Sequence, residues 1–325
     1  MALFLWLGAA CVLLLVLFLF TDCNPVLWVL ARLGRSPAAL AGRVVWLTGA
    51  SSGIGEALAV ELARHGARLA LSARRLPELE RVRRRCLEAG APADAVLVLP
   101  LDVTALDEHR PALARLLAHF GRLDVLINNA GRTQRSGWAI THPDVDRQLF
   151  DVNVFAPVEL TRAALPELLA RRGGHVVVMS STAGTCPVPC SGSYTGSKHA
   201  LHGYFGALRS ELSGAGLVVT LLCPGPTFSD MLRTAFVDRP GQVFGGEMAP
   251  SDRRMSAERC AQLCAVAIGA QLAEAWIAMQ PVLLFQYLNH YTPRLVNLAF
   301  RLFGARIAMQ LRDSKSDFST DLKEE

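Results

Sequence analysis

A tyrosine and a lysine four residues apart, Tyr194 and Lys198, are the residues of this sequence best suited to move a proton. On a helix this spacing puts both side chains on one face, about one turn apart. A nearby ammonium favours the charged form of a phenol, whose ordinary pKa is about 10, so we expect Lys198 to bring the pKa of Tyr194 towards neutrality. Such a phenol can donate a proton to a carbonyl oxygen or accept one from an alcohol.

A glycine-rich turn that could hold a dinucleotide follows a short apolar run. Residues 43–48 read as a strand, the next seven residues are Gly-Ala-Ser-Ser-Gly-Ile-Gly, and residues 56–65 read as a helix. Glycines permit a tight turn and close approach of the backbone, and the free N–H groups of a helix N-terminus can bind a pyrophosphate. The spacing is Gly-x-x-x-Gly-x-Gly, and a purely structural turn remains an alternative at this point.

The elements that must position these residues alternate between apolar runs and helical segments. The runs are apolar enough to be buried on both faces, which predicts an α/β fold with a doubly wound parallel sheet, a Rossmann fold of seven strands. The expected strands span residues 43–48, 67–73, 96–101, 123–128, 175–180, 217–222 and 275–278. The expected helices include residues 56–65, 77–89, 107–120, 197–212 and 257–272.

The N-terminal residues 2–20 form an uncharged apolar run. As a helix this run would cover roughly 28 Å, close to the ~30 Å hydrocarbon core of a bilayer. A cleaved signal peptide is the alternative, but such peptides carry positive charge before a shorter apolar region. We therefore expect a single-pass transmembrane anchor at residues 1–22 and a linker at residues 23–42. Arginines after the run favour a catalytic domain on the cytosolic side.

A catalytic domain at residues 43–280 is expected to be followed by an apolar, aromatic extension at residues 281–312 and a polar, disordered tail at residues 313–325. The extension has two readings of equal weight. It either docks on the membrane and shapes an apolar substrate entrance, or packs on the core or in a homodimer interface. Residues 228–255, rich in glycine and proline, read as a flap over the substrate or as a plain surface loop.

The composition argues against two classes of partner. The net charge of +5 comes from arginines spread along the chain, without a basic arm, so no nucleic acid is expected to bind. The eight cysteines form no Cys-x-x-Cys pair and the eight histidines show no metal-ligand spacing, so no metal site is expected. Free and mostly buried thiols suit a reducing compartment.

Motifs from about residue 44 to residue 279 resemble those of the short-chain dehydrogenase/reductase family. In the family's order they are Thr48-Gly-x-x-x-Gly-Ile-Gly55, Leu101-Asp102-Val103, Asn128-Asn-Ala-Gly131, Asn153, Ser181, Tyr194-x-x-x-Lys198 and Pro224-Gly225. The resemblance implies hydride transfer that uses the chemistry of a nicotinamide cofactor and needs no metal. Within this family, the chain looks most like members that are anchored in the endoplasmic reticulum membrane. This resemblance implies a lipophilic substrate such as a retinoid, a steroid or a foreign carbonyl compound.

The resemblance implies four catalytic residues. Tyr194 would be the acid/base, and Lys198 would hold the nicotinamide ribose hydroxyls and favour the phenolate. Ser181, thirteen residues before Tyr194, would hydrogen-bond the substrate oxygen and stabilise its developing charge, with Ser180 as the alternative. Asn153 would hold the water that connects Lys198 to solvent, although an asparagine inside a helix can instead bond only its own backbone.

The cofactor-binding residues that the resemblance implies lie where the expected strands end. They are Thr48, Gly49, Ser51, Ser52, Gly53, Ile54, Gly55, Arg74, Arg75, Asp102, Val103, Asn129, Ala130, Gly131, Tyr194, Lys198, Pro224, Gly225 and Thr227. A member that prefers NAD usually has an acidic residue after the second strand, where this chain has Arg74 and Arg75. A guanidinium binds a phosphate through paired hydrogen bonds, so NADP(H) is expected, with Arg74 as the first choice. Thr227 departs from the Val or Ile usual in the family.

The sequence therefore predicts an NADPH-dependent carbonyl reductase, or the reverse alcohol dehydrogenase, for lipophilic substrates that arrive from a membrane. The alternative is a membrane-anchored scaffold that binds the cofactor without turnover. The joint presence of Asn153, Ser181, Tyr194 and Lys198 favours the enzyme, because a scaffold does not need all four.

Overall fold

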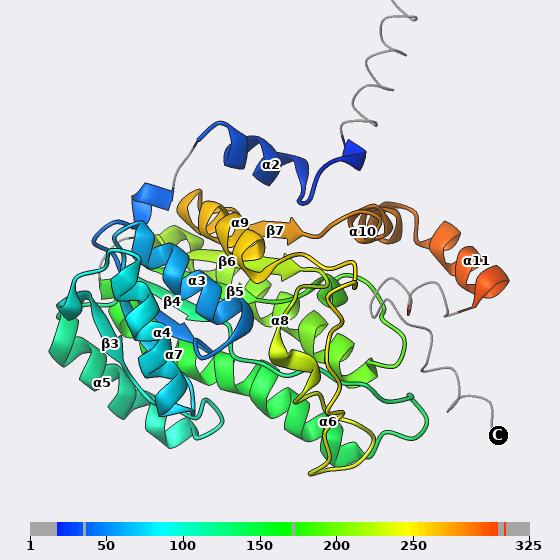
Figure 1. The fold of residues 1–325 in the computed structure, drawn as a ribbon, viewed down its shortest axis with the longest axis horizontal. Coiled ribbons are helices and arrows are strands. Elements are labelled where there is room, and N and C mark those ends of the chain that lie inside the picture. Colours follow the sequence, from blue (N-terminus) through cyan, green and yellow to red (C-terminus); the bar gives the residue numbers. More distant parts are fainter. Residues whose placement is uncertain (1–17, 35–36, 171–172, 305–308, 310–325) are drawn as a thin grey trace, which may run out of the picture.

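The computed structural model of the protein describes residues 18–34, 37–170, 173–304 and 309. At its centre is a parallel sheet of seven strands with helices packed on both faces (Figure 1). The strands are β1 (Val44–Thr48), β2 (Arg68–Ser72), β3 (Val96–Val98), β4 (Val125–Asn128), β5 (His175–Met179), β6 (Val218–Pro224) and β7 (Glu274–Ile277). They lie in the order β3-β2-β1-β4-β5-β6-β7, and every neighbouring pair is parallel. The expected doubly wound sheet is confirmed.

Alternating side chains of β1 enter two separate hydrophobic cores. Val45 and Leu47 lie in the core with α3, α4 and α9, whereas Val44 and Trp46 lie in the core with α5, α7 and α8. A strand covered on both faces must be apolar throughout, which is why β1 reads as a continuous apolar run. The helices are α2 (Pro25–Arg32), α3 (Gly53–Arg64), α4 (Leu76–Glu88), α5 (His109–Phe120), α6 (Pro143–Phe150), α7 (Ala156–Ala170), α8 (Gly192–Leu212), α9 (Ala257–Gly269), α10 (Val282–Tyr291) and α11 (Pro293–Phe303).

The helix that carries the tyrosine and lysine starts earlier than the sequence suggested. It begins at Gly192, whereas the expected helix began at residue 197. Tyr194 and Lys198 therefore both lie on α8, one turn apart, as their spacing requires. A π-helical turn, η4 (Asp151–Phe155), separates α6 from α7.

Within the segment expected to be a linker, residues 23–42, helix α2 packs against α9. In Figure 1, α2 lies along α9, and Leu27 of α2 is fully buried. Asp22 forms an ion pair with Arg259 of α9 at 2.7 Å. Apart from residues 18–22, the expected membrane anchor lies outside the described residues. Within the part of the chain that is described, no helix combines the length and the apolar character needed to cross a bilayer.

The C-terminal extension divides into one packed helix and one exposed helix. On α10, Gln286 is fully buried and donates from Nε2 to the Thr185 hydroxyl at 2.8 Å. On α11, Val296 is buried, but four large apolar side chains are half-exposed or more: Leu295, Leu298, Leu302 and Phe303. Packing on the core therefore accounts for α10 but not for α11. The expected polar tail, residues 313–325, lies outside the described residues.

The segment expected to be a flap, residues 228–255, covers the tyrosine of α8. Phe236 is buried with Val145 and Leu149 of α6, and Tyr194 packs against this cluster. Backbone hydrogen bonds hold the segment to the loop after β4, from the N–H of Phe236 to the carbonyl of Thr133 and from the N–H of Arg135 to the carbonyl of Phe236.

Candidate active site

The residues singled out in the sequence gather at one edge of the sheet. Most lie at or after the carboxyl ends of six parallel strands, β1 to β6; Tyr194 and Lys198 lie on α8, and Asn153 lies on the π-helical turn between α6 and α7. The strand order reverses between β1 and β4, so the chain leaves these two strands in opposite directions and opens a crevice between them. In open α/β sheets ligands bind in such a crevice.

The glycine turn between β1 and α3 leaves no room for a side chain. A Cβ atom at Gly55 would lie 2.2 Å from the carbonyl oxygen of Gly49 and 2.5 Å from Nδ2 of Asn129. Gly53 has a φ of +58°, in the left-handed region that favours glycine. Backbone atoms therefore line the turn, and the N–H groups that begin α3 are free of a side-chain cap from Ser52. This cradle fits the pyrophosphate of a dinucleotide.

Thr48 joins the glycine turn to the loop after β4. Its hydroxyl accepts from the N–H groups of Asn129 and Ala130, at 3.0 and 3.1 Å. Asn129 returns two bonds, from Nδ2 to the carbonyls of Thr48 and Gly49. The two motifs thus fix each other across the crevice, and the Asn-Asn-Ala-Gly segment is more than an ordinary turn.

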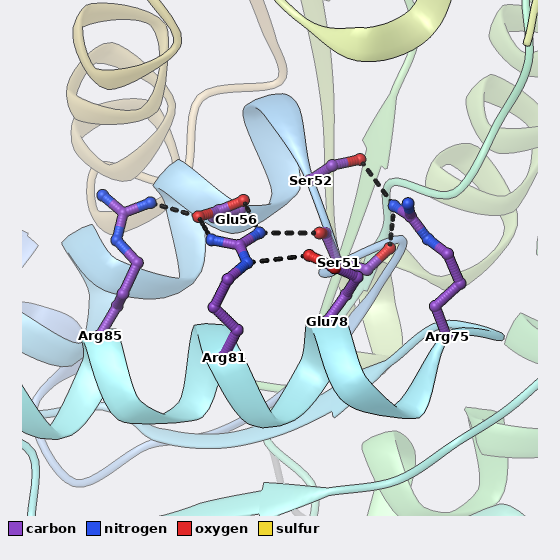
Figure 2. Close-up of polar contacts among 7 residues, drawn as sticks. All are labelled: Ser51, Ser52, Glu56, Arg75, Glu78, Arg81 and Arg85. Atoms are coloured by element: carbon purple, nitrogen blue, oxygen red, sulfur yellow. Dashed lines mark hydrogen bonds and ion pairs between the residues drawn. The ribbon is translucent and has the colours of Figure 1, made fainter. Parts of the chain in front are cut away.

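Of the two arginines after β2, Arg75 is the one that contacts the glycine turn. Figure 2 shows its guanidinium beside the hydroxyls of Ser51 and Ser52, with Nη2 at 3.2 and 3.4 Å. Arg74, the first choice from the sequence, is exposed and close enough to Asp102 to help lower the pKa of its carboxyl. Both arginines are exposed and follow closely after the end of β2.

Asp102 stabilises the loop that follows β3. Its Oδ1 accepts from the N–H of Thr104 at 3.0 Å and from the Thr104 hydroxyl at 2.7 Å. Burial acts to raise the pKa of Asp102, but these bonds and Arg74 outweigh it, so the pKa is lowered. Val103 is buried in the core below. The carboxylate is therefore ionised and held at the crevice edge.

The phenol of Tyr194 is held in its protonated form. Burial raises its pKa, and a hydrogen bond with Ser181 only partly opposes this effect. The expected lowering by Lys198 is wrong for this structure, because the pKa of Tyr194 is raised and Lys198 is not among the groups that act to lower it. The Nζ of Lys198 lies 5.8 Å from the centre of the Tyr194 ring and donates to the carbonyl of Met179 at 2.8 Å.

Ser181, not Ser180, faces the tyrosine. The Ser181 hydroxyl bonds Tyr194 and the carbonyl of Pro224. The Ser180 hydroxyl instead meets Nε2 of His202 at 3.0 Å, on the other side of the strand end. The preference for Ser181 that the spacing indicated agrees with this geometry.

Asn153 sits at the π-helical turn beside Lys198. It holds both backbone groups of Arg132, because its Oδ1 accepts from the N–H and its Nδ2 donates to the carbonyl, each at 2.9 Å. A Cβ atom on Gly131 would lie 3.0 Å from Oδ1 of Asn153 and 3.6 Å from Nζ of Lys198. Gly131, Asn153 and Lys198 are therefore neighbours, and Asn153 bonds a distant strand end, not its own helix.

The last predicted segment turns at the end of β6. Gly225 donates from its N–H to the carbonyl of Ile277 at 2.8 Å, and a Cβ atom there would meet Cβ of Ala278 at 2.8 Å. Thr227 bonds the Gly225 carbonyl through its hydroxyl at 3.0 Å. Pro224 accepts from Ser181, so this turn and the Ser181 loop are fixed to each other.

Two contributors were missed in the sequence because their partners lie far away along the chain. Gln134 is fully buried and its Oε1 accepts from the N–H of Ser193 at 2.9 Å, which fixes the first turn of α8. His202, expected to pack or to face solvent, bonds Ser180 and lies 3.6 Å from Glu274. The seven described cysteines are free thiols. The described residues contain no cluster of three or more side chains suited to hold a metal ion.

Comparisons with known proteins agree with this geometry. A family model described as short chain dehydrogenase matches residues 43–240. Human "Dehydrogenase/reductase SDR family member 7" is 42% identical over 299 residues, which cover 90% of this chain and 88% of that protein. A similar protein of Drosophila melanogaster, "Dehydrogenase/reductase SDR family protein 7-like", is 35% identical and covers 79% of this chain and 78% of its own length.

Two solved structures share the fold. A short-chain dehydrogenase/reductase from Burkholderia phymatum, in complex with NAD, has a TM-score of 0.68 at 25% identity and covers 79% of this chain and 96% of its own. A metagenomic short-chain oxidoreductase in complex with NADP has a TM-score of 0.54 at 36% identity and covers 57% of this chain and 84% of its own. The protein therefore belongs to the short-chain dehydrogenase/reductase family and is an oxidoreductase that uses a nicotinamide cofactor.

Proposed function

We propose that the protein reduces lipophilic carbonyl compounds with NADPH, with a retinoid, a steroid or a foreign ketone or aldehyde as substrate; the reverse reaction is alcohol oxidation. The observation that carries the reduction is the protonated phenol of Tyr194 beside the Ser181 hydroxyl. The phenol is protonated at neutral pH and so has a proton to donate, whereas alcohol oxidation needs the phenolate. The preference for NADPH is supported by Arg74 and Arg75 at the end of β2.

NADPH, when bound, would supply the hydride for the carbonyl carbon. Tyr194 donates its proton to the carbonyl oxygen as negative charge develops there. Ser181 is placed to hydrogen-bond the same oxygen, because its hydroxyl already meets the phenol. Phe236 and the α6 side chains beside it pack against the partly buried Tyr194 ring and hold it in place.

Lys198 and Asn153 act behind the tyrosine in this proposal. The Lys198 ammonium, buried at 5% exposure, would hold the nicotinamide ribose hydroxyls and pass a proton from solvent back to Tyr194 after the phenol has protonated the substrate. Asn153 fixes the backbone of Arg132 and lies beside Lys198, so it would keep that proton path in place.

The rate of carbonyl reduction is expected to fall as the pH rises past about 8. Burial lowers the pKa of Lys198 to about 8, so the side chain is charged below that pH and loses its charge above it. Tyr194, whose pKa is raised, stays protonated through the same range and does not cause the fall. The measurement is kcat with saturating cofactor and substrate from about pH 6 to pH 10. A flat profile over that range would contradict the role given to Lys198.

The activity is tested by following oxidation of NADPH and, separately, of NADH by the full-length protein in detergent. Retinal, steroid ketones and aromatic diketones provide the carbonyl panel. Faster turnover with NADPH than with NADH and activity on at least one class are expected. Tight NADPH binding without turnover, in both reaction directions and across a broader panel, would favour the scaffold alternative.

We also propose that the protein is a single-pass protein of the endoplasmic reticulum membrane, with the anchor at residues 1–22 and the catalytic domain at residues 43–280 on the cytosolic side. Phe18 packs edge-on against Tyr287 of α10, with ring centres 5.2 Å apart, so the end of the apolar run meets the C-terminal extension. Thiol labelling of the cysteines in sealed microsomes tests the orientation, and labelling only after detergent would place the domain in the lumen. Cross-linking would test whether a homodimer forms.

The exposed apolar side chains of α11 are expected to enter the lipid interface beside the anchor. Full-length Leu298→Trp in vesicles with brominated acyl chains should show quenching of the added tryptophan fluorescence. Leu106→Trp is the matched control, because Leu106 is 47% exposed but lies just before α5, at the other end of the molecule from α11 (Figure 1). Equal quenching at the two positions would show that α11 does not contact lipid.

A further inference from the structure

A line of hydrogen bonds joins α4 to the glycine turn through Glu56 and Arg81, two residues given no chemical role above (Figure 2). Arg81 of α4 bonds both carboxylate oxygens of Glu56, with Nη2 2.7 Å from Oε2, and donates to the Ser51 carbonyl at 3.3 Å. The hydroxyl of the same serine is bonded by Arg75 at 3.2 Å. Ser51 thus takes its backbone bond from Arg81 and its side-chain bond from Arg75.

Glu56 is a buried carboxylate near the N-terminus of α3, where the helix dipole favours a negative charge. It lies on the first turn of α3, directly after Gly55, and is 8% exposed. Burial acts to raise its pKa, but hydrogen bonds from Arg81 and Arg85 outweigh this effect and the pKa is lowered. Glu56 is therefore ionised, and its negative charge is balanced by two guanidinium groups of α4.

The three arginines of Figure 2 differ in what they contact. Arg85 bonds Glu56, and Arg81 bonds Glu56, Glu78 and the Ser51 carbonyl. Arg75 bonds two hydroxyls and, among the described residues, no carboxylate. Its charge is consequently the one in this group that an arriving anion can use.

We propose that Arg81 is a positioning residue for cofactor choice, which acts through Ser51 to hold the Arg75 guanidinium where the 2′-phosphate of NADPH would bind. This role depends on the NADPH preference proposed above. A free, exposed arginine loses rotamer freedom when it binds a phosphate, so an arginine that is already held by the turn binds more tightly. NADH lacks the 2′-phosphate and gains little from the same arrangement.

The test compares two ligands that differ only by the 2′-phosphate, adenosine 2′,5′-bisphosphate and 5′-AMP, by calorimetry on the full-length protein in detergent. Arg81→Gln should weaken binding of the bisphosphate about tenfold and binding of 5′-AMP less than about threefold. The two losses differ because only the bisphosphate has the 2′-phosphate that Arg75 would bind. Arg85→Gln is the matched control and should stay within about twofold of wild type for both ligands, because it keeps the Arg81 bonds to Glu56 and Ser51.

Arg75→Gln separates this role from the cofactor preference itself. If Arg75→Gln loses affinity only for the bisphosphate while Arg81→Gln binds both ligands as Arg85→Gln does, Arg81 does not have the proposed role. The NADPH preference would still be supported. Equal affinity of the wild type for the two ligands would overturn both. Equal losses of both ligands in Arg81→Gln would show only a loosened turn and would also overturn the role.

A second variant keeps the test decisive if Arg81→Gln does not fold. Arg81→Lys retains a positive charge beside Glu56 but lacks the planar fork whose separate nitrogens bond both Glu56 oxygens and the Ser51 carbonyl. The same selective loss of the bisphosphate is expected. Wild-type selectivity in Arg81→Lys would mean that charge balance alone matters and that Arg81 does not position Arg75.

Discussion

Replacing Tyr194 with phenylalanine should lower kcat for carbonyl reduction by roughly two to four orders of magnitude, the usual contribution of a general acid. The change removes one hydroxyl and leaves the ring in place against Phe236, Val145 and Leu149. The fold and the binding of NADPH should therefore be retained. Steady-state kinetics with saturating NADPH, together with NADPH binding by fluorescence, provide the measurement.

Tyr204→Phe is the matched control for this change. Tyr204 lies on the same helix, α8, but is 45% exposed and belongs to neither hydrophobic core. The kcat of the Tyr204→Phe variant should stay within about twofold of the wild-type value, as for most surface substitutions. Wild-type turnover in Tyr194→Phe would refute the proposed acid, and equal losses in the two variants would point to general damage of α8.

Gly55→Ala should abolish useful cofactor binding. The added Cβ atom would lie 2.2 Å from the Gly49 carbonyl oxygen, and that neighbour is backbone, so the turn itself must move. Overpacking of this kind costs about 3 kcal/mol at its upper range, which corresponds to about a hundredfold weaker NADPH binding if the strain falls on the cradle. Thermal unfolding and NADPH titration of the same sample would separate lost stability from lost binding.

Gly203→Ala offers the opposite case with the same chemical change. Gly203 lies within α8, and a Cβ atom there would meet nothing within 4 Å. Alanine at such a helical site should raise stability by about 0.4–1 kcal/mol through the unfolded chain and leave NADPH binding unchanged. Normal cofactor affinity in Gly55→Ala would show that the turn does not cradle the pyrophosphate.

The sheet could be predicted because the residue types of each strand reflect how deeply that strand is buried. A strand buried on both faces must be apolar at every position, and seven such runs appear in the sequence with helices between them. The parallel arrangement then brings the strand ends to one edge, so Thr48 and Asn129 could be placed near each other although 81 positions separate them in the chain. The glycine turn could also be predicted from local sequence, because only glycine fits where two backbone segments approach this closely.

Protonation states and partner choice were decided only by the tertiary structure. The Tyr-x-x-x-Lys spacing suggested that Lys198 would lower the pKa of Tyr194, but the rotamer of Lys198 turns its ammonium to the Met179 carbonyl and burial raises the phenol pKa. The sequence interpretation preferred Arg74 to Arg75, and only the path of the chain from β2 into α4 puts Arg75 against Ser51.

The sequence by itself determined which residue types stand at the edge of the sheet, because strand periodicity and glycine geometry are local properties. The tertiary structure decided which atoms those residues meet. Gln134 reaches the first turn of α8 across 59 positions, and Arg81 reaches Ser51 across 30. Contacts between residues so far apart in the chain depend on how helices pack on the sheet, so they cannot be predicted from local sequence patterns.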